Sequence, residues 1–283
     1  MKVLVVQGYN MDANPISKVA FNQFWGPLMD SVKKWAAEMG YDYKFYTGPV
    51  EEIDYPSLLN TPSSYSATRG QFYKFQWCDH PEYDQVIWLD ADVYVWGLPN
   101  PIKENHYFWA GNKYDWERYL SPDKYFRPGE VNIPLSIYEE PAQEILDVSA
   151  SEWAPMPWRR LQMAVYWGSG QAMNDLNTWA KECAYNKDSR GDIVNGTSIW
   201  ARTEGHDYTE EQYLAQWVHD NSDKVTWYPV ADSDDFPQTQ KFFYNFSKAM
   251  PTQKDCFVHF GGSDKYVNYQ RFLCWRAWNR YTE

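Results

Sequence analysis

Residues 86–92 read Val-Ile-Trp-Leu-Asp-Ala-Asp, an apolar run that ends in two carboxylates one residue apart. A continuous apolar run of this kind predicts a strand that is buried on both faces of a parallel sheet. Ligands of such sheets collect at the carboxyl ends of the strands, where Asp90 and Asp92 are expected. Two carboxylates in that position can bind a hard divalent cation, which can in turn bind a diphosphate. The same spacing at Asp232 and Asp234 lies in a polar run and predicts a solvated loop.

The surrounding pattern predicts an α/β fold that opens with a strand, a helix and a second strand. Residues 3–6 are continuously apolar, and apolar residues recur every three or four positions over 21–39, which is helical periodicity. Gly40 is expected to end that helix, and residues 41–46 alternate as a strand does. Strand, helix, strand is the beginning of a Rossmann-like unit. Further helices are expected near residues 68–78, 174–185 and 210–219 and at the C-terminus, and further strands near residues 108–111, 165–167, 225–228 and 256–260.

Charge and composition narrow the class of ligand. The 283 residues carry 38 acidic and 26 basic side chains, a formal net charge of −12, whereas a general nucleic-acid binder needs a basic surface. Aromatic residues make up 19% of the chain, and flat amphipathic rings suit sugar faces and nucleobases as well as cores. No apolar run is long enough for a transmembrane segment, and the first residues form too short an apolar run for a signal peptide. We therefore expect a cytoplasmic protein that binds no nucleic acid.

Motifs along nearly the whole chain resemble, in the same order, the metal-dependent glycosyltransferases of the GT-A fold. The similarity is closest to the glycogenin and lipopolysaccharide galactosyltransferase type and to the plant-type galactosyl- and xylosyltransferases. The motifs are Val3–Gly8, Trp35-Ala36 before Gly40-Tyr41-Asp42-Tyr43, Arg69-Gly70-Gln71-Phe72-Tyr73-Lys74, Asp90-Ala91-Asp92, and His259-Phe260-Gly261-Gly262-Ser263-Asp264-Lys265.

The resemblance implies a fold and a domain organisation. The expected fold is α/β, a GT-A-type, Rossmann-like nucleotide-binding domain with a mixed, mostly parallel central sheet. The chain shows no internal repeat and no long linker, so a single domain over residues 1–283 is expected. Residues 1–100 would bind the nucleotide sugar, and residues 101–283 would bind the acceptor and close the site.

The resemblance also implies a metal and a donor site. In these families two aspartates and the closing histidine bind Mn²⁺, and the lysine after them contacts the diphosphate, which assigns Asp90, Asp92 and His259 to Mn²⁺ or Mg²⁺ and Lys265 to the phosphates. Two carboxylates and a neutral imidazole suit Mn²⁺ and leave coordination positions for phosphate oxygens. The further residues that the resemblance places on the donor are Gly8, Tyr9, Arg69, Lys74, Asp90, Ala91 and Gly262, with Gly8 and Tyr9 beside the nucleobase.

Several of these candidates also have a plain structural interpretation. Glu210-Glu211-Gln212 resembles an acidic helix start that lies near the reacting sugar and would carry a catalytic role, but the helix dipole alone also favours carboxylates there. Gly168-Ser169-Gly170 stands where relatives often have Asn-x-Gly, and either lines the donor pocket or forms a turn. Arg69 and Lys74 either contact the donor or lie on a solvated helix surface, and Tyr9 either contacts the base or fills a buried turn.

The resulting prediction is a transferase that moves a hexose or pentose from a nucleoside diphosphate sugar to a hydroxyl of a glycan or another acceptor. The resemblance implies that the nucleotide is UDP. Retention of the anomeric configuration follows from the resemblance. An inverting reaction would need a general base, which Glu210, Glu211 or Asp207 could supply. A non-catalytic carbohydrate-binding protein is the first alternative, but it leaves the Asp pair and the His259 motif unexplained. A sugar-nucleotide pyrophosphorylase would need a Gly-rich, basic loop after the first strand, where this chain has Gly8-Tyr9-Asn10-Met11-Asp12.

Overall fold

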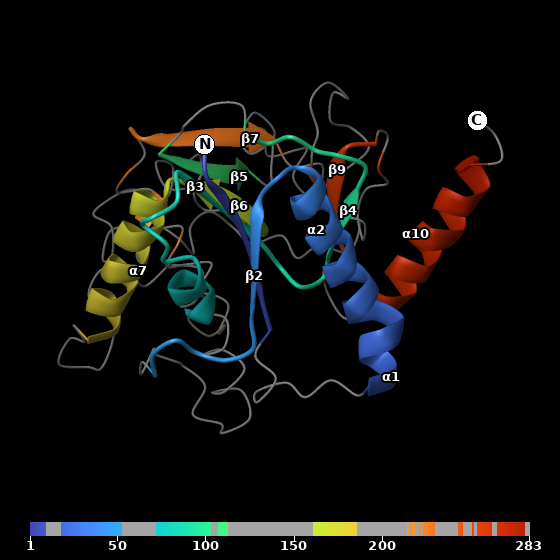
Figure 1. Cartoon of the computed structure of the whole chain (residues 1–283), viewed down its shortest axis with the longest axis horizontal. Coiled ribbons are helices and arrows are strands. Elements are labelled where there is room, and N and C mark those ends of the chain that lie inside the picture. Colours follow the sequence, from blue (N-terminus) through green and yellow to red (C-terminus); the bar gives the residue numbers. More distant parts are fainter. Residues whose placement is uncertain are drawn as a thin grey trace, which may run out of the picture.

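A six-stranded sheet and a smaller three-stranded sheet organise the chain (Figure 1). The computed structural model describes residues 1–9, 18–52, 72–102, 107–112, 161–185, 214, 217–218, 221, 223–229, 243–245, 251, 254–261 and 265–280. The large sheet contains β1 (Val3–Gly8), β2 (Asp42–Tyr46), β3 (Gln85–Leu89), β5 (Phe108–Asn112), β6 (Leu161–Gly168) and β7 (Val225–Pro229). The small sheet contains β4 (Val93–Trp96), β8 (Phe243–Asn245) and β9 (Cys256–His259). The helices are α1 (Lys18–Ala20), the π-helical turn η1 (Phe21–Trp25), α2 (Gly26–Glu38), a short helix over 72–77, α7 (Gly170–Tyr185) and α10 (Lys265–Arg280).

The large sheet is mixed but mostly parallel, as expected. Its strand order is β2-β1-β3-β6-β5-β7. The pairs β1–β2, β1–β3 and β5–β7 are parallel, and only β6 runs against its neighbours β3 and β5. Every residue of β1 and β3 is buried, which explains why both strands read as continuous apolar runs in the sequence. The predicted α/β class is therefore confirmed.

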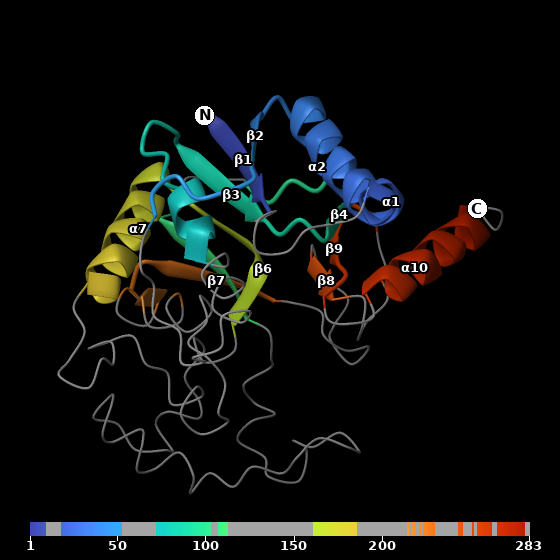
Figure 2. The same cartoon turned by 90° about the horizontal axis from the view of Figure 1, so that it is seen from below.

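Side chains alternate between the two faces of this sheet, because successive residues of a strand point in opposite directions. On one face the strands pack against the helix over 72–77 and α7, and on the other face against α2, so that α2 and α7 lie on opposite sides of the sheet (Figure 2). The first face includes Leu4, Val6, Val86, Trp88, Phe108 and Tyr166, and the second includes Val3, Val5, Ile87, Leu89, Val165 and Trp167.

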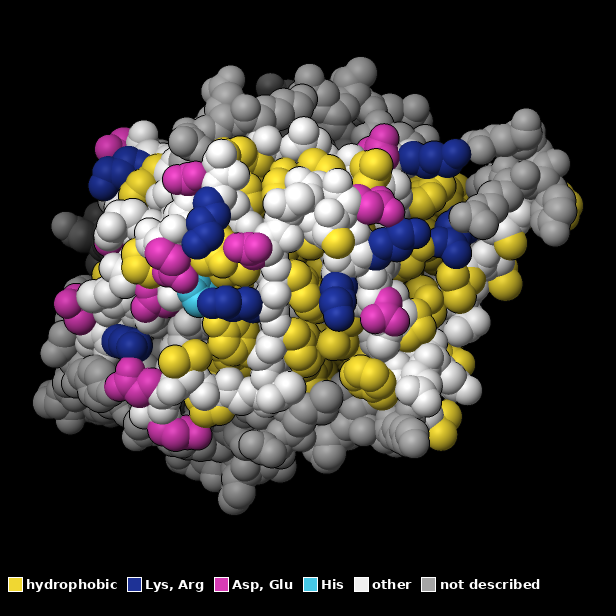
Figure 3. Space-filling model, viewed as in Figure 1, with side chains coloured by type: hydrophobic (Ala, Val, Ile, Leu, Met, Phe, Trp, Pro, Cys, Tyr) yellow, Lys and Arg dark blue, Asp and Glu magenta, His cyan; other side chains and the backbone are white. Residues whose placement is uncertain are grey.

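The small sheet packs under a separate apolar cluster that joins the N-terminal helices to the C-terminal helix. Phe24 of η1, Val258 of β9 and Phe272 of α10 are buried in this cluster. The outer side of α10 keeps apolar surface, with Val267 48% and Trp278 73% exposed, and Figure 3 shows hydrophobic side chains continuing along this helix. Within the described part of the chain, no helix combines the length and the apolar character that crossing a membrane requires.

The expected elements that fall on described residues are present, and their ends differ where tertiary contacts decide them. Most of the expected helix over 210–219 lies outside the described residues. The expected strand at 165–167 is the end of the longer β6, which begins at Leu161. Helix α7 begins at Gly170, earlier than the expected residue 174, because the Ser169 hydroxyl accepts a hydrogen bond from the Ala172 N–H at 3.1 Å and caps the helix. Strand β8 was not expected from the sequence. The single-domain organisation remains a prediction.

Trp35 offers a test of how the two sheets are joined. Its ring lies edge-on to Tyr41 and to Phe257 of β9, its indole N–H donates to the Pro99 carbonyl at 2.9 Å, and it is 2% exposed. We expect Trp35→Ala to lower the free energy of unfolding by about 3–5 kcal/mol, because it leaves a large cavity, as measured by urea denaturation. Trp278→Ala is the matched control, and since that side chain is 73% exposed it should change the value by less than about 0.5 kcal/mol. Equal losses in the two variants would contradict this account of the core.

Candidate metal and donor site

The two aspartates lie where the large sheet passes into the small one. Strand β3 ends at Leu89, and the next residues form a turn in which the Val93 N–H donates to the Asp90 carbonyl at 3.0 Å. Strand β4 then begins at Val93 in the other sheet. Asp90 therefore follows the carboxyl end of a strand that is parallel to β1, which is where ligands of such sheets bind.

His259 reaches the same place through the pairing of β4 with β9. These strands are antiparallel, with Val93 opposite His259, and the Phe260 N–H donates to the Asp92 carbonyl at 3.1 Å. The imidazole Nε2 of His259 lies 3.4 Å from Asp92 Oδ1. One ligand atom each from Asp90, Asp92 and His259 lies within 4.8 Å of the other two. The structure thus brings together the three residues that the sequence assigned to a metal.

The donor set and spacing of this triad fit a divalent cation. Ligand atoms of a six-coordinate Mg²⁺-sized ion lie roughly 3 Å apart when adjacent and roughly 4 Å apart when opposite. The separations of up to 4.8 Å therefore call for a small inward movement of the side chains. Two carboxylates and one imidazole suit Mn²⁺ or Mg²⁺ and supply three of the six positions. The remaining positions are open to phosphate oxygens or water.

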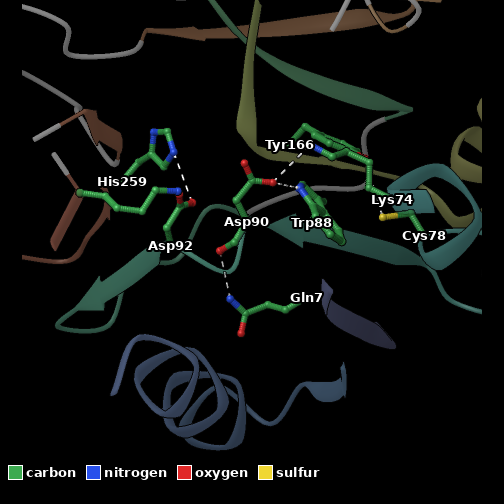
Figure 4. Close-up of polar contacts among 9 residues, drawn as sticks. Gln7, Lys74, Cys78, Trp88, Asp90, Asp92, Tyr166 and His259 are labelled. Carbon is green, nitrogen blue, oxygen red and sulfur yellow. Dashed lines mark hydrogen bonds and ion pairs between the residues drawn. The ribbon is translucent and has the colours of Figure 1, made fainter. Parts of the chain in front are cut away.

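Asp90 is oriented by donors on the side of the large sheet (Figure 4). Its Oδ1 accepts the indole N–H of Trp88 at 2.7 Å and the ammonium of Lys74 at 3.3 Å, while its carbonyl accepts the Gln7 side-chain amide at 3.1 Å. Because a carboxylate is planar, fixing Oδ1 also fixes the direction of the second oxygen. Lys74 is 6% exposed, so it does not lie on a solvated helix surface. Its predicted contact with the donor is a separate role that stays a prediction.

Asp92 is held ionised by its neighbours. Burial by itself would raise the pKa of its carboxyl group, but the electrostatic and hydrogen-bond contacts of His259 and Lys265 hold that pKa below its usual range. The Lys265 ammonium lies 2.8 Å from Asp92 Oδ2. Lys265 is the first residue of α10, so the start of this helix carries the predicted phosphate ligand to the metal site.

Gly8 is the last residue of β1 and Tyr9 follows it, at the same end of the parallel strands as Asp90. A Cβ added at Gly8 would lie 2.2 Å from the Trp77 ring, so packing alone requires glycine there. Burial, and in second place the charge of Asp92, raise the pKa of the Tyr9 hydroxyl above its ordinary value. The Tyr9 ring is also 5.0 Å from the ring of Trp25. A contact of Tyr9 with a nucleobase is compatible with this position and stays a prediction.

The remaining candidates are only partly placed. Ala91 is buried in the turn between the two aspartates. Gly168-Ser169-Gly170 forms the turn that starts α7, and the pairing of Gly168 with Val86 places it at the amino end of β3, opposite the end that carries Asp90. This position, away from the metal triad, favours the interpretation of the segment as a turn over that as part of the donor pocket. The candidates outside the described residues are Arg69, Glu210, Glu211, Gln212 and Gly262.

Three site residues were not singled out from the sequence: Gln7, Trp88 and Gly261. Gln7 is 0% exposed and is the one polar residue of β1, and a polar residue that ends an apolar run could have been a signal. Trp88 appears in the sequence as part of an apolar strand, which hides the role of its N–H. Gly261 matters because an added Cβ would lie 2.4 Å from Cε1 of His259, a contact that no sequence pattern reveals.

Comparison with known proteins finds similarity in structure only. No protein-family model matches the chain, and no curated protein does. One similar solved structure is a glycosyltransferase involved in the glycosylation of the major capsid of PBCV-1, with a TM-score of 0.45 and 11% identity, covering 95% of this chain and 100% of that chain. Another is the WbbM bifunctional glycosyltransferase, with a TM-score of 0.43 and 13% identity, covering 96% of this chain and 49% of that chain. Since both TM-scores lie below 0.5, we base the function on the residues of the site.

Because Gly261 lies close to the His259 imidazole, adding a methyl group at this position should disturb the metal site. In Gly261→Ala the imidazole must turn away from the new Cβ, because its Cε1 would otherwise lie 2.4 Å from it. We expect Mn²⁺ affinity to fall about 10-fold or more, as when a residue that orients a ligand is lost, with little change in melting temperature because a side-chain tip can move. Titration calorimetry with Mn²⁺ measures this. Gly48→Ala is the control, since its Cβ would meet nothing within 4 Å, and equal Mn²⁺ affinities in both variants would refute the role.

Proposed function

We propose that this protein is a metal-dependent glycosyltransferase whose donor is a nucleoside diphosphate sugar. The observation that supports this most is the assembly of Asp90, Asp92 and His259 within 4.8 Å of one another, with the Lys265 ammonium 2.8 Å from Asp92. Two carboxylates, an imidazole and a mobile cation form a set that can hold a divalent ion and a diphosphate together. A bound ion would supply positive charge to the diphosphate as it leaves.

The chain's own residues would divide the donor between them. Asp90, Asp92 and His259 would hold the ion, and Lys265 would contact the phosphate oxygens and stabilise the charge that grows on them. Tyr9, at the end of β1, lies beside the nucleobase, which we take to be uracil from the sequence resemblance. Lys74 keeps Asp90 in place from the buried side, where it is bonded at 3.3 Å. Mn²⁺ is the proposed ion, with Mg²⁺ as the alternative.

The proposed reaction exchanges one bond at the anomeric carbon of the sugar. The bond from that carbon to the diphosphate oxygen breaks, a bond to the acceptor hydroxyl oxygen forms, and the hydroxyl proton passes to the released diphosphate. Retention of configuration, the transfer of a hexose or pentose, and the placement of Glu210, Glu211 and Gln212 near the reacting sugar are part of the proposal and come from the sequence resemblance. In an inverting reaction, Glu210 or Glu211 would instead take the proton.

A non-catalytic carbohydrate-binding protein is the competing function from another class. Aromatic side chains suit it, but binding a sugar face does not call for two carboxylates and an imidazole within 4.8 Å. Such a protein would bind glycans without a nucleotide and without a metal. A sugar-nucleotide pyrophosphorylase is less well supported, because the sequence at the end of β1 and after it is Gly8-Tyr9-Asn10-Met11-Asp12, which is neither Gly-rich nor basic.

Calorimetric titration with UDP tests the proposal. In the presence of Mn²⁺ we expect wild-type protein to bind UDP, and we expect excess EDTA or the substitution Asp92→Asn to weaken binding at least about tenfold, because the ion that links protein and diphosphate is lost. Asp84→Asn, at an exposed carboxylate, is the matched control and should bind as wild type does. Hydrolysis of a panel of UDP-sugars then identifies the donor. Equal UDP binding with Mn²⁺ and with EDTA, or glycan binding without nucleotide, would overturn the proposal.

A further inference from the structure

Among the described residues, each carboxylate of the metal triad has a lysine ammonium beside it. Lys74 is bonded to Asp90 at 3.3 Å, and Lys265 is bonded to Asp92 at 2.8 Å. Each of the two carboxylates that would bind a divalent ion thus already faces a positive charge of the chain itself. An ion that enters this site adds two positive charges beside these ammonium groups, which oppose it.

The two lysines differ in their freedom to move. The side chain of Lys74 is 7% exposed, and its ammonium lies 5.5 Å from the centre of the Trp88 ring. It is enclosed on the face of the large sheet that packs against the helix over 72–77 and α7. The side chain of Lys265 is 32% exposed and stands at the start of α10. A divalent ion can therefore displace the Lys265 ammonium from Asp92, whereas Lys74 stays with Asp90.

A second partner for the Lys265 ammonium is the indole ring of Trp25, whose centroid is 5.0 Å away. A cation near an aromatic face at this distance is attracted to the ring. Trp25 belongs to the π-helical turn η1, and such turns are frequent at functional sites. This turn is tied to the first residues of α10 by a hydrogen bond from the Tyr266 hydroxyl to Gln23 Oε1 at 3.3 Å and by the edge-on rings of Phe24 and Tyr269.

We propose that Lys265 is a displaceable counter-ion of Asp92 and that Trp25 positions it. A divalent ion takes the place of the ammonium at Asp92, and the ammonium stays over the Trp25 ring and turns to the diphosphate that binds with the ion. Metal alone then binds weakly and metal with diphosphate binds well. The diphosphate step rests on the proposed function, whereas the competition between Lys265 and the ion does not.

The substitution Lys265→Met tests the competition through effects of opposite sign. We expect it to tighten the binding of Mn²⁺ alone about tenfold, since one unit charge beside a divalent ion changes its affinity by that amount even at the permittivity of water. We expect it to weaken the binding of UDP in saturating Mn²⁺ at least about tenfold, because a charge-assisted contact to phosphate is lost. Calorimetry measures both, and thermal unfolding checks that the variant folds. Lys34→Met removes the same charge from a side chain that is 78% exposed and should change neither affinity.

The substitution Trp25→Leu tests the positioning role. It should weaken the binding of UDP with Mn²⁺ about 3- to 30-fold, the range expected for a partly desolvated cation–π contact. When Trp25→Leu is introduced into the Lys265→Met variant, it should not weaken UDP binding further. Trp278→Leu, at an exposed indole, is the control. Equal losses from Trp25→Leu in both backgrounds would show that the ring does not act through Lys265.

The outcomes separate this inference from the proposed function. If Lys265→Met leaves the affinity for Mn²⁺ alone unchanged or weaker in a folded protein, the counter-ion role is overturned even if UDP binds. If that affinity rises and wild-type protein does not bind UDP, the counter-ion role stands and the proposed function fails.

Discussion

The antiparallel pairing of β4 with β9 is the constraint on which the site depends. It sets Val93 opposite His259 and joins the Asp92 carbonyl to the Phe260 N–H at 3.1 Å. A shift of this register by one residue would point His259 to the other face of the small sheet, and no metal triad would form. The same pairing also directs the chain after β9 into α10, which begins with Lys265. One pairing therefore places both the third metal ligand and the cation beside Asp92.

Charge compensation is the second requirement of the site. Two carboxylates that are largely removed from water repel each other and lose hydration, so they remain ionised only if cations or hydrogen-bond donors face them. The structure meets this need from two sides, with Trp88 and Lys74 on Asp90 and with His259 and Lys265 on Asp92. The enclosed Lys74 keeps Asp90 in position, whereas the more exposed Lys265 can move when an ion binds. The same lysines therefore stabilise the buried carboxylates and affect the binding of an ion.

Sequence periodicity predicted most of the elements, and its failures have physical reasons. The buried strands β1 and β3 are unmistakable as apolar runs, because both of their faces are covered. The start of α7 was placed four residues late, since a cap by Ser169 is one hydrogen bond and not a periodic pattern. Strand β8 is three residues long, and so short a segment carries no detectable alternation.

The sequence by itself determined the α/β class, the strand that delivers Asp90 and Asp92, and the pairing of these residues with His259 and Lys265 through a recognisable motif. These features are local in sequence or carried by a motif. Only the tertiary structure decided that Lys74 bonds to Asp90, that Gly168-Ser169-Gly170 lies at the amino end of β3, away from Asp90, and that Trp25 lies beside Lys265. The physical reason is that these contacts join residues far apart in the chain. Strand register and helix packing set their distances, and neither is a property of a short stretch of sequence.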